Sequence, residues 1–257
     1  MTASTNPANT PWAPVAVVTG AAGGIGAAIS ARLVRDGHTV AMLDTAAAVH
    51  PTCKEVDGAY SAQLDVTDAV AVRRVLDGIR HDLDGLDVLV NCAGTAHRSS
   101  FAATTADEFM ADVRSNLLGT FLTCQAAVFP HMQHAGQGRL INIASISGKT
   151  GGTGPVHPDG AGGRSGPGYA SAKAGIINLT RWMAREVGRF GITSNAVAPG
   201  PIISPMTHDA TYDASDIPLG RLGTTEEVAD AVAWLAGDGA RYINGTVVDV
   251  DGGLTRA

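Results

Sequence analysis

The chain has 257 residues, of which 45% are apolar and 16% charged, enough apolar material for one large domain around a sheet buried on both faces. Its net charge of -6 and the absence of a Lys/Arg run argue against nucleic acid and anionic membranes as partners. Cys53, Cys92 and Cys124 lie far apart and form no C-x-x-C pair. We therefore predict no disulfide framework, no metal site and a cytoplasmic location.

We predict a flexible N-terminal tail over residues 1–13 and a single domain over residues 14–257. Thr, Ser, Asn and Pro dominate the tail, which offers little apolar surface to bury. The sequence shows neither the basic and apolar regions of a signal peptide nor an apolar run of about 18 residues, so we expect neither a secretory signal nor a membrane helix.

The first motif is a strand, a glycine-rich turn and a helix. Val15–Thr19 is a short apolar run, residues 20–26 read Gly-Ala-Ala-Gly-Gly-Ile-Gly, and an amphipathic segment follows from Ile25 to Asp36. Glycines let the backbone approach a pyrophosphate closely, and the N-terminus of the helix points its free N–H groups at the phosphates. This order predicts a dinucleotide site.

An acidic residue ends the second predicted strand. Thr39–Leu43 is apolar and Asp44 follows it, where a dinucleotide-binding unit places an acid that accepts hydrogen bonds from the adenosine ribose. Asp44 would repel a 2′-phosphate, and neither the glycine turn nor the residues just after Asp44 include an Arg or Lys to attract one. We therefore predict NAD, rather than NADP, as the cofactor.

Strands and helices alternate to the end of the chain, which predicts an α/β fold: a doubly wound parallel sheet of seven strands with helices on both faces. Ligands of such sheets bind beyond the carboxyl ends of the strands. The further predicted strands are Ala59–Leu64, Val88–Val90, Arg139–Ala144, Ile192–Val197 and Thr246–Val250. The further predicted helices are Thr67–Leu83, Ala106–His134 with Thr105 as N-cap and Glu108 in a capping box, a helix carrying Tyr169 to Gly188, and Thr225–Ala236.

Tyr169 and Lys173 are four residues apart and therefore share one face of their helix. A lysine cation about 4 Å from a phenol, at an effective dielectric constant near 20, stabilises the phenolate by up to about 4 kcal/mol, or about three pKa units. The pair is therefore predicted to lower the pKa of the tyrosine toward neutral pH, where it can act as a general acid or base. On its own, the same spacing is also that of an exposed helical pair.

With these residues in place, the sequence resembles a short-chain dehydrogenase/reductase of the single-domain, Rossmann type. The resemblance covers about residues 14–254. The motifs that carry it are Thr19-Gly20-x-x-x-Gly24-Ile25-Gly26, Asp65-Val66, Asn91-x-Ala93-Gly94, Asn116-Leu117-Leu118-Gly119, Ser145, Tyr169-x-x-x-Lys173 and Pro199-Gly200.

The resemblance implies a hydride transfer between a nicotinamide and a secondary alcohol or ketone, with four catalytic residues. Tyr169 would be the general acid/base and Ser145 would hydrogen-bond the substrate oxygen. Lys173 would hold the nicotinamide ribose and lower the pKa of the tyrosine, and Asn116 would hold a water that relays protons. The cofactor-binding residues implied, besides Tyr169 and Lys173, are Gly20, Gly23, Ile25, Gly26, Asp44, Asp65, Val66, Asn91, Ala93, Gly94, Pro199, Gly200, Ile202 and Ser204.

The spacing between Ser145 and Tyr169 is about twice that usual in the family. The excess lies in the glycine-rich stretch 147–168, which we expect to be a loop with little structure of its own. It is either a lid or substrate collar, with His157, Asp159 or Arg164 touching the substrate, or a surface excursion or subunit contact. Ser147 is an alternative to Ser145, although only Ser145 stands directly at the strand end.

Several residues outside the shared motifs bear on the substrate and on reactivity. His97 and Arg98 follow the Asn91 motif and are candidates for the substrate pocket, whereas Cys92 is interpreted as packing. The segment from Pro201 to Leu219 is expected to be a substrate flap that contains three Asp and no Lys or Arg, which disfavours a polyanionic substrate.

The leading hypothesis is therefore an NAD-dependent alcohol dehydrogenase/carbonyl reductase that acts on a small to medium, neutral or weakly charged secondary alcohol or ketone. The alternative is a 3-oxoacyl thioester reductase. It is demoted because carrier-protein reductases of the family have basic residues just before the serine strand, where residues 135–138 read Ala-Gly-Gln-Gly. A non-catalytic dinucleotide-binding regulator is the remote alternative. A homotetramer is expected, with a dimer second, because the helix with Ala170, Ala174, Ile177 and Trp182 and the long helix before it show more apolar surface than one sheet face needs.

Overall fold

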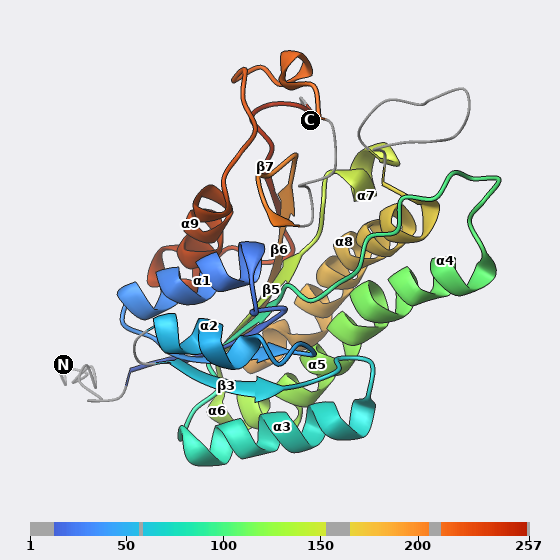
Figure 1. The fold of residues 1–257 in the computed structure, drawn as a ribbon. Helices are drawn as coiled ribbons and strands as arrows, with labels where there is room; N and C mark the ends of the chain where they lie inside the picture. The colour runs from blue at the N-terminus through green and yellow to red at the C-terminus, as the bar shows by residue number, and fades with distance from the viewer. Residues whose placement is uncertain (1–12, 57–58, 153–164, 206–211, 256–257) are drawn as a thin grey trace.

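The computed structural model describes residues 13–56, 59–152, 165–205 and 212–255, and a seven-stranded parallel sheet runs through its centre (Figure 1). The strand order is β3-β2-β1-β4-β5-β6-β7, so the chain winds outward in both directions from β1 and β4. The predicted doubly wound sheet is confirmed. Its strands are β1 (Val15–Thr19), β2 (Thr39–Asp44), β3 (Ala59–Gln63), β4 (Val88–Asn91), β5 (Gly138–Ile143), β6 (Ile192–Pro199) and β7 (Val247–Val250).

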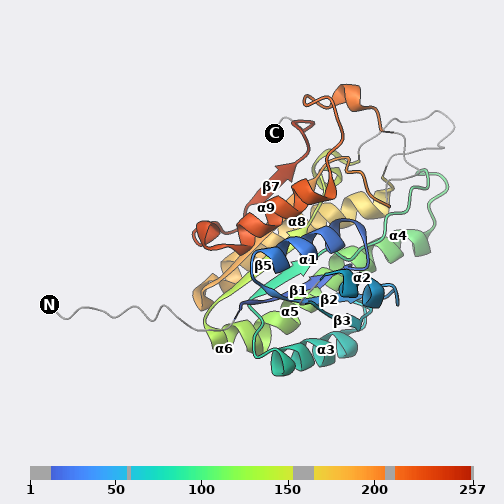
Figure 2. The same ribbon diagram turned by 60° about the vertical axis from the view of Figure 1, so that its left-hand side comes forward.

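Helices cover both faces of the sheet, each with its own apolar core (Figures 1 and 2). Helices α1 (Gly24–Arg35), α2 (Val49–Glu55) and α9 (Thr225–Ala236) pack on one face through residues such as Ile29 and Val232. Helices α3 (Ala69–Asp82), α5 (Gly119–Ala126) and α8 (Pro167–Val187) pack on the other through residues such as Leu76 and Met183. The inner strands β1 and β6 are buried along their whole length, because helices cover both of their faces.

The segment predicted as one helix from Ala106 to His134 is a row of five helical pieces. They are α4 (Ala106–Asp112), the π-type turn η1 (Val113–Leu118), α5, the π-type turn η2 (Ala127–Met132) and α6 (Gln133–Ala135). The predicted capping box of Thr105 and Glu108 is present. The predicted continuity was wrong, because Pro130 interrupts the segment and Phe129 is non-helical.

Other differences lie at the ends of elements and in two short helices. The structure adds two short helices that were not predicted. Helix α2 follows Asp44 and has no side-chain cap, and α7 (Ser147–Thr150) lies at the start of the glycine-rich stretch. Part of the expected loop 147–168 is therefore helical, and its end lies in the first turn of α8. His157, Asp159 and Arg164 fall outside the described residues, as does the predicted tail apart from its last residue.

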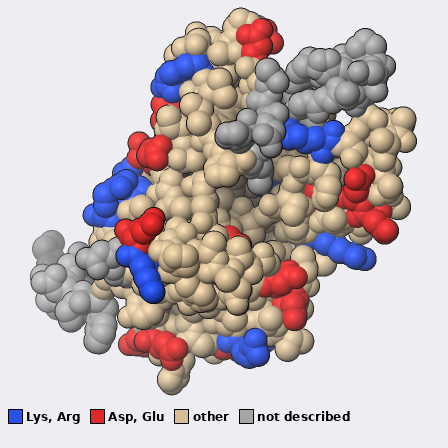
Figure 3. All heavy atoms as spheres, viewed as in Figure 1, with Lys and Arg blue, Asp and Glu red and all other residues tan. Residues whose placement is uncertain are grey.

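Basic and acidic side chains are interspersed over the face shown in Figure 3, and the surface is hollowed near its middle. None of the helices in the described ranges is long and apolar enough to cross a membrane. Within these same ranges, no three His, Cys, Asp or Glu side chains are grouped as a metal site would require.

Candidate active site

A cleft of about 460 Å³ opens at the carboxyl ends of the strands. It lies at the junction of β1 and β4, where the winding of the chain reverses and where ligands of such sheets bind. All of the site residues predicted from the sequence line it, with the exception of Asn91. They are Gly20, Gly23, Ile25, Gly26, Asp44, Asp65, Val66, Ala93, Gly94, Asn116, Ser145, Tyr169, Lys173, Pro199, Gly200, Ile202 and Ser204.

Asn91 does not line the cleft, so the expectation that its side chain packs along the cofactor is corrected. Its Nδ2 donates to Asn142 Oδ1 at 2.9 Å, and its Oδ1 accepts from Thr123 Oγ1 at 2.6 Å. Successive side chains of a strand point to opposite faces, and Asn91 shares the parity of Leu89, which packs in the core beneath α5. Asn91 thus ties β4 to β5 and α5.

The glycine turn between β1 and α1 packs so closely on neighbouring backbone that it has no room for side chains at Gly20 and Gly26. Gly20 has a φ of +67°, and a Cβ there would lie 2.7 Å from Cα of Ala93. A Cβ on Gly26 would collide with the carbonyl of Gly20. The N-cap of α1, Gly23, provides no side-chain hydrogen bond, and the first turn has no acidic residue. The N–H groups of α1 therefore face the cleft, as a phosphate-binding helix terminus requires.

Asp44, the last residue of β2, and Asp65, which follows β3, lie at one end of the cleft. Asp44 accepts hydrogen bonds from the backbone N–H groups of Ala22 and Ala46, each at 3.0 Å. Asp65 accepts from the N–H and the hydroxyl of Thr67, each at 2.8 Å. Both carboxylates are thus fixed in place, and the cations that line the cleft within the described residues are Arg98 and Lys173.

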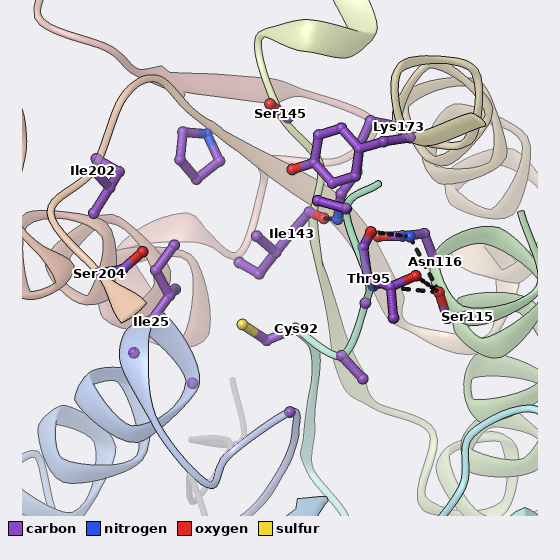
Figure 4. A pocket seen from close by; sticks show the side chains of 18 of the residues that line it. Ile25, Cys92, Thr95, Ser115, Asn116, Ile143, Ser145, Lys173, Ile202 and Ser204 are labelled. Atoms are coloured by element: carbon purple, nitrogen blue, oxygen red, sulfur yellow. Dashed lines mark hydrogen bonds between the residues drawn. The ribbon is translucent and has the colours of Figure 1, made fainter. Parts of the chain in front are cut away.

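At the other end, α8 brings Tyr169 and Lys173 against the end of β5. Lys173 is 4% exposed, and its Nζ donates to the carbonyl oxygen of Ile143 at 2.7 Å. The same Nζ lies 5.4 Å from the centre of the Tyr169 ring. Ser145 follows β5 and hydrogen-bonds Tyr169. Figure 4 shows Ser145 and Lys173 at the same end of the cleft, across from Ile202 and Ser204.

The pKa of Tyr169 lies opposite to the direction predicted from the sequence. Burial raises it to about 12, although the hydrogen bond with Ser145 and the charge of Arg98 act to lower it. Burial also lowers the pKa of Lys173 to about 8. The predicted direction was wrong because it counted only the charge of Lys173 on the phenol, whereas removal from water favours the neutral form of each group.

Asn116 lies in the π-type turn η1 and is fully buried. Its Nδ2 donates to the carbonyl oxygens of Thr95 and Asp112, each at 2.9 Å (Figure 4). Its Oδ1 is buried, has no hydrogen-bond partner among the residues that the structure describes, and lies against Gly94. It is therefore an acceptor of the kind that a relay water would satisfy.

The structure distinguishes the two candidate serines. Ser147 donates its N–H to Ser145 Oγ at 3.1 Å, while its own hydroxyl is hydrogen-bonded to Ser165 at 3.0 Å. Ser145, but not Ser147, acts on the pKa of Tyr169. This arrangement favours Ser145 as the group that contacts the substrate oxygen.

Some lining residues were not predicted from the sequence. Ser165 and Tyr212 line the cleft, as do Thr95 and Ser115, and Cys92 points its thiol into it (Figure 4). Burial raises the pKa of the Cys92 thiol to about 11, so the interpretation of Cys92 as a non-nucleophile is consistent with its setting. Arg98, a candidate for the substrate pocket, lines the cleft, whereas His97, the other candidate, is not among the described residues that line it.

A family model described as enoyl-(acyl carrier protein) reductase matches residues 20–255. The chain belongs to the short-chain dehydrogenase/reductase family. A (3R)-3-hydroxyacyl-CoA dehydrogenase of Canis lupus familiaris is 40% identical to this chain, and the match covers 93% of this chain and 95% of the relative. A 3-oxoacyl-(acyl-carrier-protein) reductase FabG of Salmonella typhimurium is 36% identical over 93% of the chain and 96% of the relative. A crystal structure of gox2181 superposes with a TM-score of 0.87 at 30% identity, covering 96% of this chain and 97% of that one.

This short-chain dehydrogenase/reductase is therefore an oxidoreductase that acts on alcohol or keto groups with a nicotinamide dinucleotide. The residues present fit such a cofactor. The turn at Gly20 leaves no room for a side chain against Ala93, and the uncapped start of α1 offers backbone donors to phosphate oxygens.

Proposed function

We propose that the protein is an NAD-dependent dehydrogenase that interconverts 3-hydroxyacyl and 3-oxoacyl compounds. The observation that carries the proposal is the convergence of Ser145, Tyr169 and Lys173 at one end of a cleft whose other end holds the glycine turn. The substrate class is supported by relatives whose names specify 3-hydroxyacyl and 3-oxoacyl substrates. These relatives favour the alternative substrate class of the sequence analysis, the 3-oxoacyl thioesters, over a generic secondary alcohol.

The bound nicotinamide supplies the hydride acceptor in oxidation and the hydride donor in reduction. Ser145 donates a hydrogen bond to the substrate oxygen and stabilises the charge that develops there. Tyr169 takes the hydroxyl proton in oxidation and returns it to the oxygen in reduction. Lys173, fixed by the Ile143 carbonyl, stabilises the phenolate form of Tyr169 by its charge, and Asn116 holds the water through which the proton leaves.

A cofactor without a 2′-phosphate is favoured by the charge at the β2 end of the cleft. Asp44 keeps its carboxylate oriented through two backbone N–H groups, so it is placed to accept bonds from ribose hydroxyls and to repel a phosphate. The lining cations Arg98 and Lys173 lie with Tyr169 rather than with Asp44.

We propose a homotetramer, with a dimer second. Ala170 and Ile177 are buried within the chain, so they cannot provide the interface expected of them, but Leu118, Phe121 and Trp182 are 39%, 38% and 59% exposed on the packed helices η1, α5 and α8. Analytical ultracentrifugation of the wild type and Trp182→Glu tests this assembly: the variant should sediment as a smaller species. A wild type that sediments as a monomer would contradict it.

The function is tested by supplying NAD with a panel of 3-hydroxyacyl thioesters, 3-hydroxy acids and simple secondary alcohols, and by following NADH formation. The expected result is that a 3-hydroxyacyl thioester or a 3-hydroxy acid, which has an oxidised carbon at C1 and the hydroxyl at C3, gives the highest kcat/KM. Cofactor binding without turnover of any compound would instead indicate a dinucleotide-binding regulator. Highest turnover of simple alcohols would contradict the substrate class.

A further inference from the structure

The segment after β4 holds Arg98 beside the catalytic turn of α8. The backbone N–H of Gly166 donates to the carbonyl oxygen of His97 at 2.9 Å. A Cβ on Gly166 would lie 2.5 Å from that oxygen and 3.8 Å from Cα of Arg98. Gly166 is the N-cap of α8, and Tyr169 follows three residues later. Arg98 is therefore fixed by close backbone packing next to the turn that carries Tyr169.

Arg98 meets Tyr212, which comes from a segment more than one hundred residues away in sequence. Nη2 of Arg98 donates to the hydroxyl oxygen of Tyr212 at 3.3 Å, and Cζ lies 6.0 Å from the centre of the Tyr212 ring. Both side chains line the cleft and both are half-buried. A guanidinium and a phenol hydroxyl side by side form a donor pair that suits a carboxylate.

The charges along the cleft are unequally distributed. Asp44 and Asp65 occupy its β2–β3 end. Arg98 lies at the Tyr169 end, close enough for its charge to lower the pKa of Tyr169. Lys173, the other lining cation, is buried and donates to the Ile143 carbonyl. Among the described residues, Arg98 is therefore the lining cation that lies near Tyr169 and keeps partial exposure to the cleft.

We propose that Arg98 and Tyr212 bind a carboxylate of the substrate, so that the enzyme acts on free 3-hydroxy and 3-oxo acids in preference to their thioesters. This inference rests on the proposed function and names the group at C1 of its substrate. The carboxylate at C1, separated from the reacting C3 by one carbon, offers Arg98 a full charge, whereas a thioester offers only a neutral carbonyl oxygen at the same position.

Kinetics with matched substrates test the specificity. The substrates are 3-hydroxybutyrate and its N-acetylcysteamine thioester, and the variants are Arg98→Met, Arg98→Lys and Tyr212→Phe. Arg98→Met should lower kcat/KM for the acid roughly 10- to 100-fold, mainly by raising KM, because the lost hydrogen bonds are charge-assisted. For the thioester the loss in kcat/KM should be clearly smaller, because it is limited to the contribution of the Arg98 charge to the pKa of Tyr169. Arg98→Lys should restore part of the loss for the acid.

Binding provides a readout that does not need turnover. Butyrate and butyramide, which have no hydroxyl to oxidise, are titrated by calorimetry into the NADH complex of the wild type, of Arg98→Met and of Arg241→Met, a matched change at an exposed arginine. Butyrate should bind the wild type and Arg241→Met more tightly than butyramide, and this difference should vanish in Arg98→Met.

The outcomes separate the two proposals. Arg98-dependent butyrate binding without oxidation of any 3-hydroxy compound would sustain the carboxylate site and overturn the proposed function. Turnover of the thioester with neither turnover nor binding of the acids would sustain the function and overturn the carboxylate site. Equal losses for acid and thioester in Arg98→Met would also overturn it, as would butyrate binding that does not depend on Arg98.

Discussion

Burial acts on Tyr169 and Lys173 in the same chemical sense, because it disfavours the charged form of each. The pKa of the phenol rises to about 12 and the pKa of the ammonium falls to about 8. At neutral pH the site therefore holds a neutral phenol above a protonated lysine. In this state Tyr169 can protonate a carbonyl oxygen, whereas oxidation of an alcohol requires the phenolate.

The pH dependence follows from these two pKa values. Oxidation needs deprotonated Tyr169 and protonated Lys173, so kcat/KM for the alcohol should rise about tenfold per pH unit up to about 8 and then level off as Lys173 loses its charge. Reduction needs both groups protonated, so its kcat/KM should be constant up to about 8 and fall above it. Lys173→Met should remove the bend near pH 8 in both directions. A bend that survives in Lys173→Met would show that another group titrates there.

The sequence predicted those site residues that are marked by their neighbours in the chain, but it did not predict how deeply each side chain is buried. The glycine turn, Asp44 and the Tyr169–Lys173 spacing depend on neighbours in the chain, and all of them line the cleft. The direction of the Tyr169 pKa depends on how much protein surrounds the hydroxyl. The meeting of Arg98 with Tyr212 depends on the packing of two distant segments. Neither can be derived from spacing.

Among the elements, the interrupted segment from α4 to α6 matters most for the site. Asp112, at the end of α4, is 1% exposed and accepts hydrogen bonds from the Thr95 hydroxyl at 2.8 Å and from the His97 ring at 2.9 Å. Its carbonyl accepts from Asn116 in the next turn. One acid thus joins the segment after β4 to the π-type turn. The capping box predicted the start of this segment. The π-type turns were not predicted, because they depend on how the segment packs against the rest of the protein.

Asp112→Asn is predicted to act on Lys173 at a distance. The Asp112 carboxylate acts to raise the pKa of Lys173, so its neutralisation should move the bend of the pH profiles below pH 8. The free energy of unfolding should also fall by about 1–3 kcal/mol, because the amide cannot satisfy the buried donors. Asp107→Asn, the same change at an exposed position of α4, is the control. Equal pH profiles for both variants would rule out this coupling.

On the scale of the molecule, the sheet order divides the cleft into two functional ends. β1, β2 and β3 bring the glycine turn, Asp44 and Asp65, while β4, β5 and β6 bring the catalytic groups and the segment from Pro199 to Ser204. This division was predictable from the alternation of strands and helices, because the positions of ligands in doubly wound sheets follow from topology. A dinucleotide that spans both ends stabilises the whole fold.

Thermal unfolding measures this stabilisation. NAD at about one hundred times its Kd should add about 2.7 kcal/mol, which raises Tm by roughly 5–10 °C in a domain of this size. NADP at the same concentration should give a smaller shift, because Asp44 repels its 2′-phosphate. Asp44→Ser should narrow the difference between the two cofactors. A larger shift with NADP than with NAD in the wild type would refute the cofactor assignment.

The central claim is that Tyr169 transfers the proton of an NAD-linked oxidoreductase, and one comparison tests it most directly. Wild type and Tyr169→Phe are assayed for NADH formation with the best substrate, and the affinity of each for NADH is measured separately. The account predicts that kcat falls about 10²- to 10⁴-fold in the variant, since a general acid/base is lost, while NADH affinity is retained. Equal turnover by both proteins would contradict it.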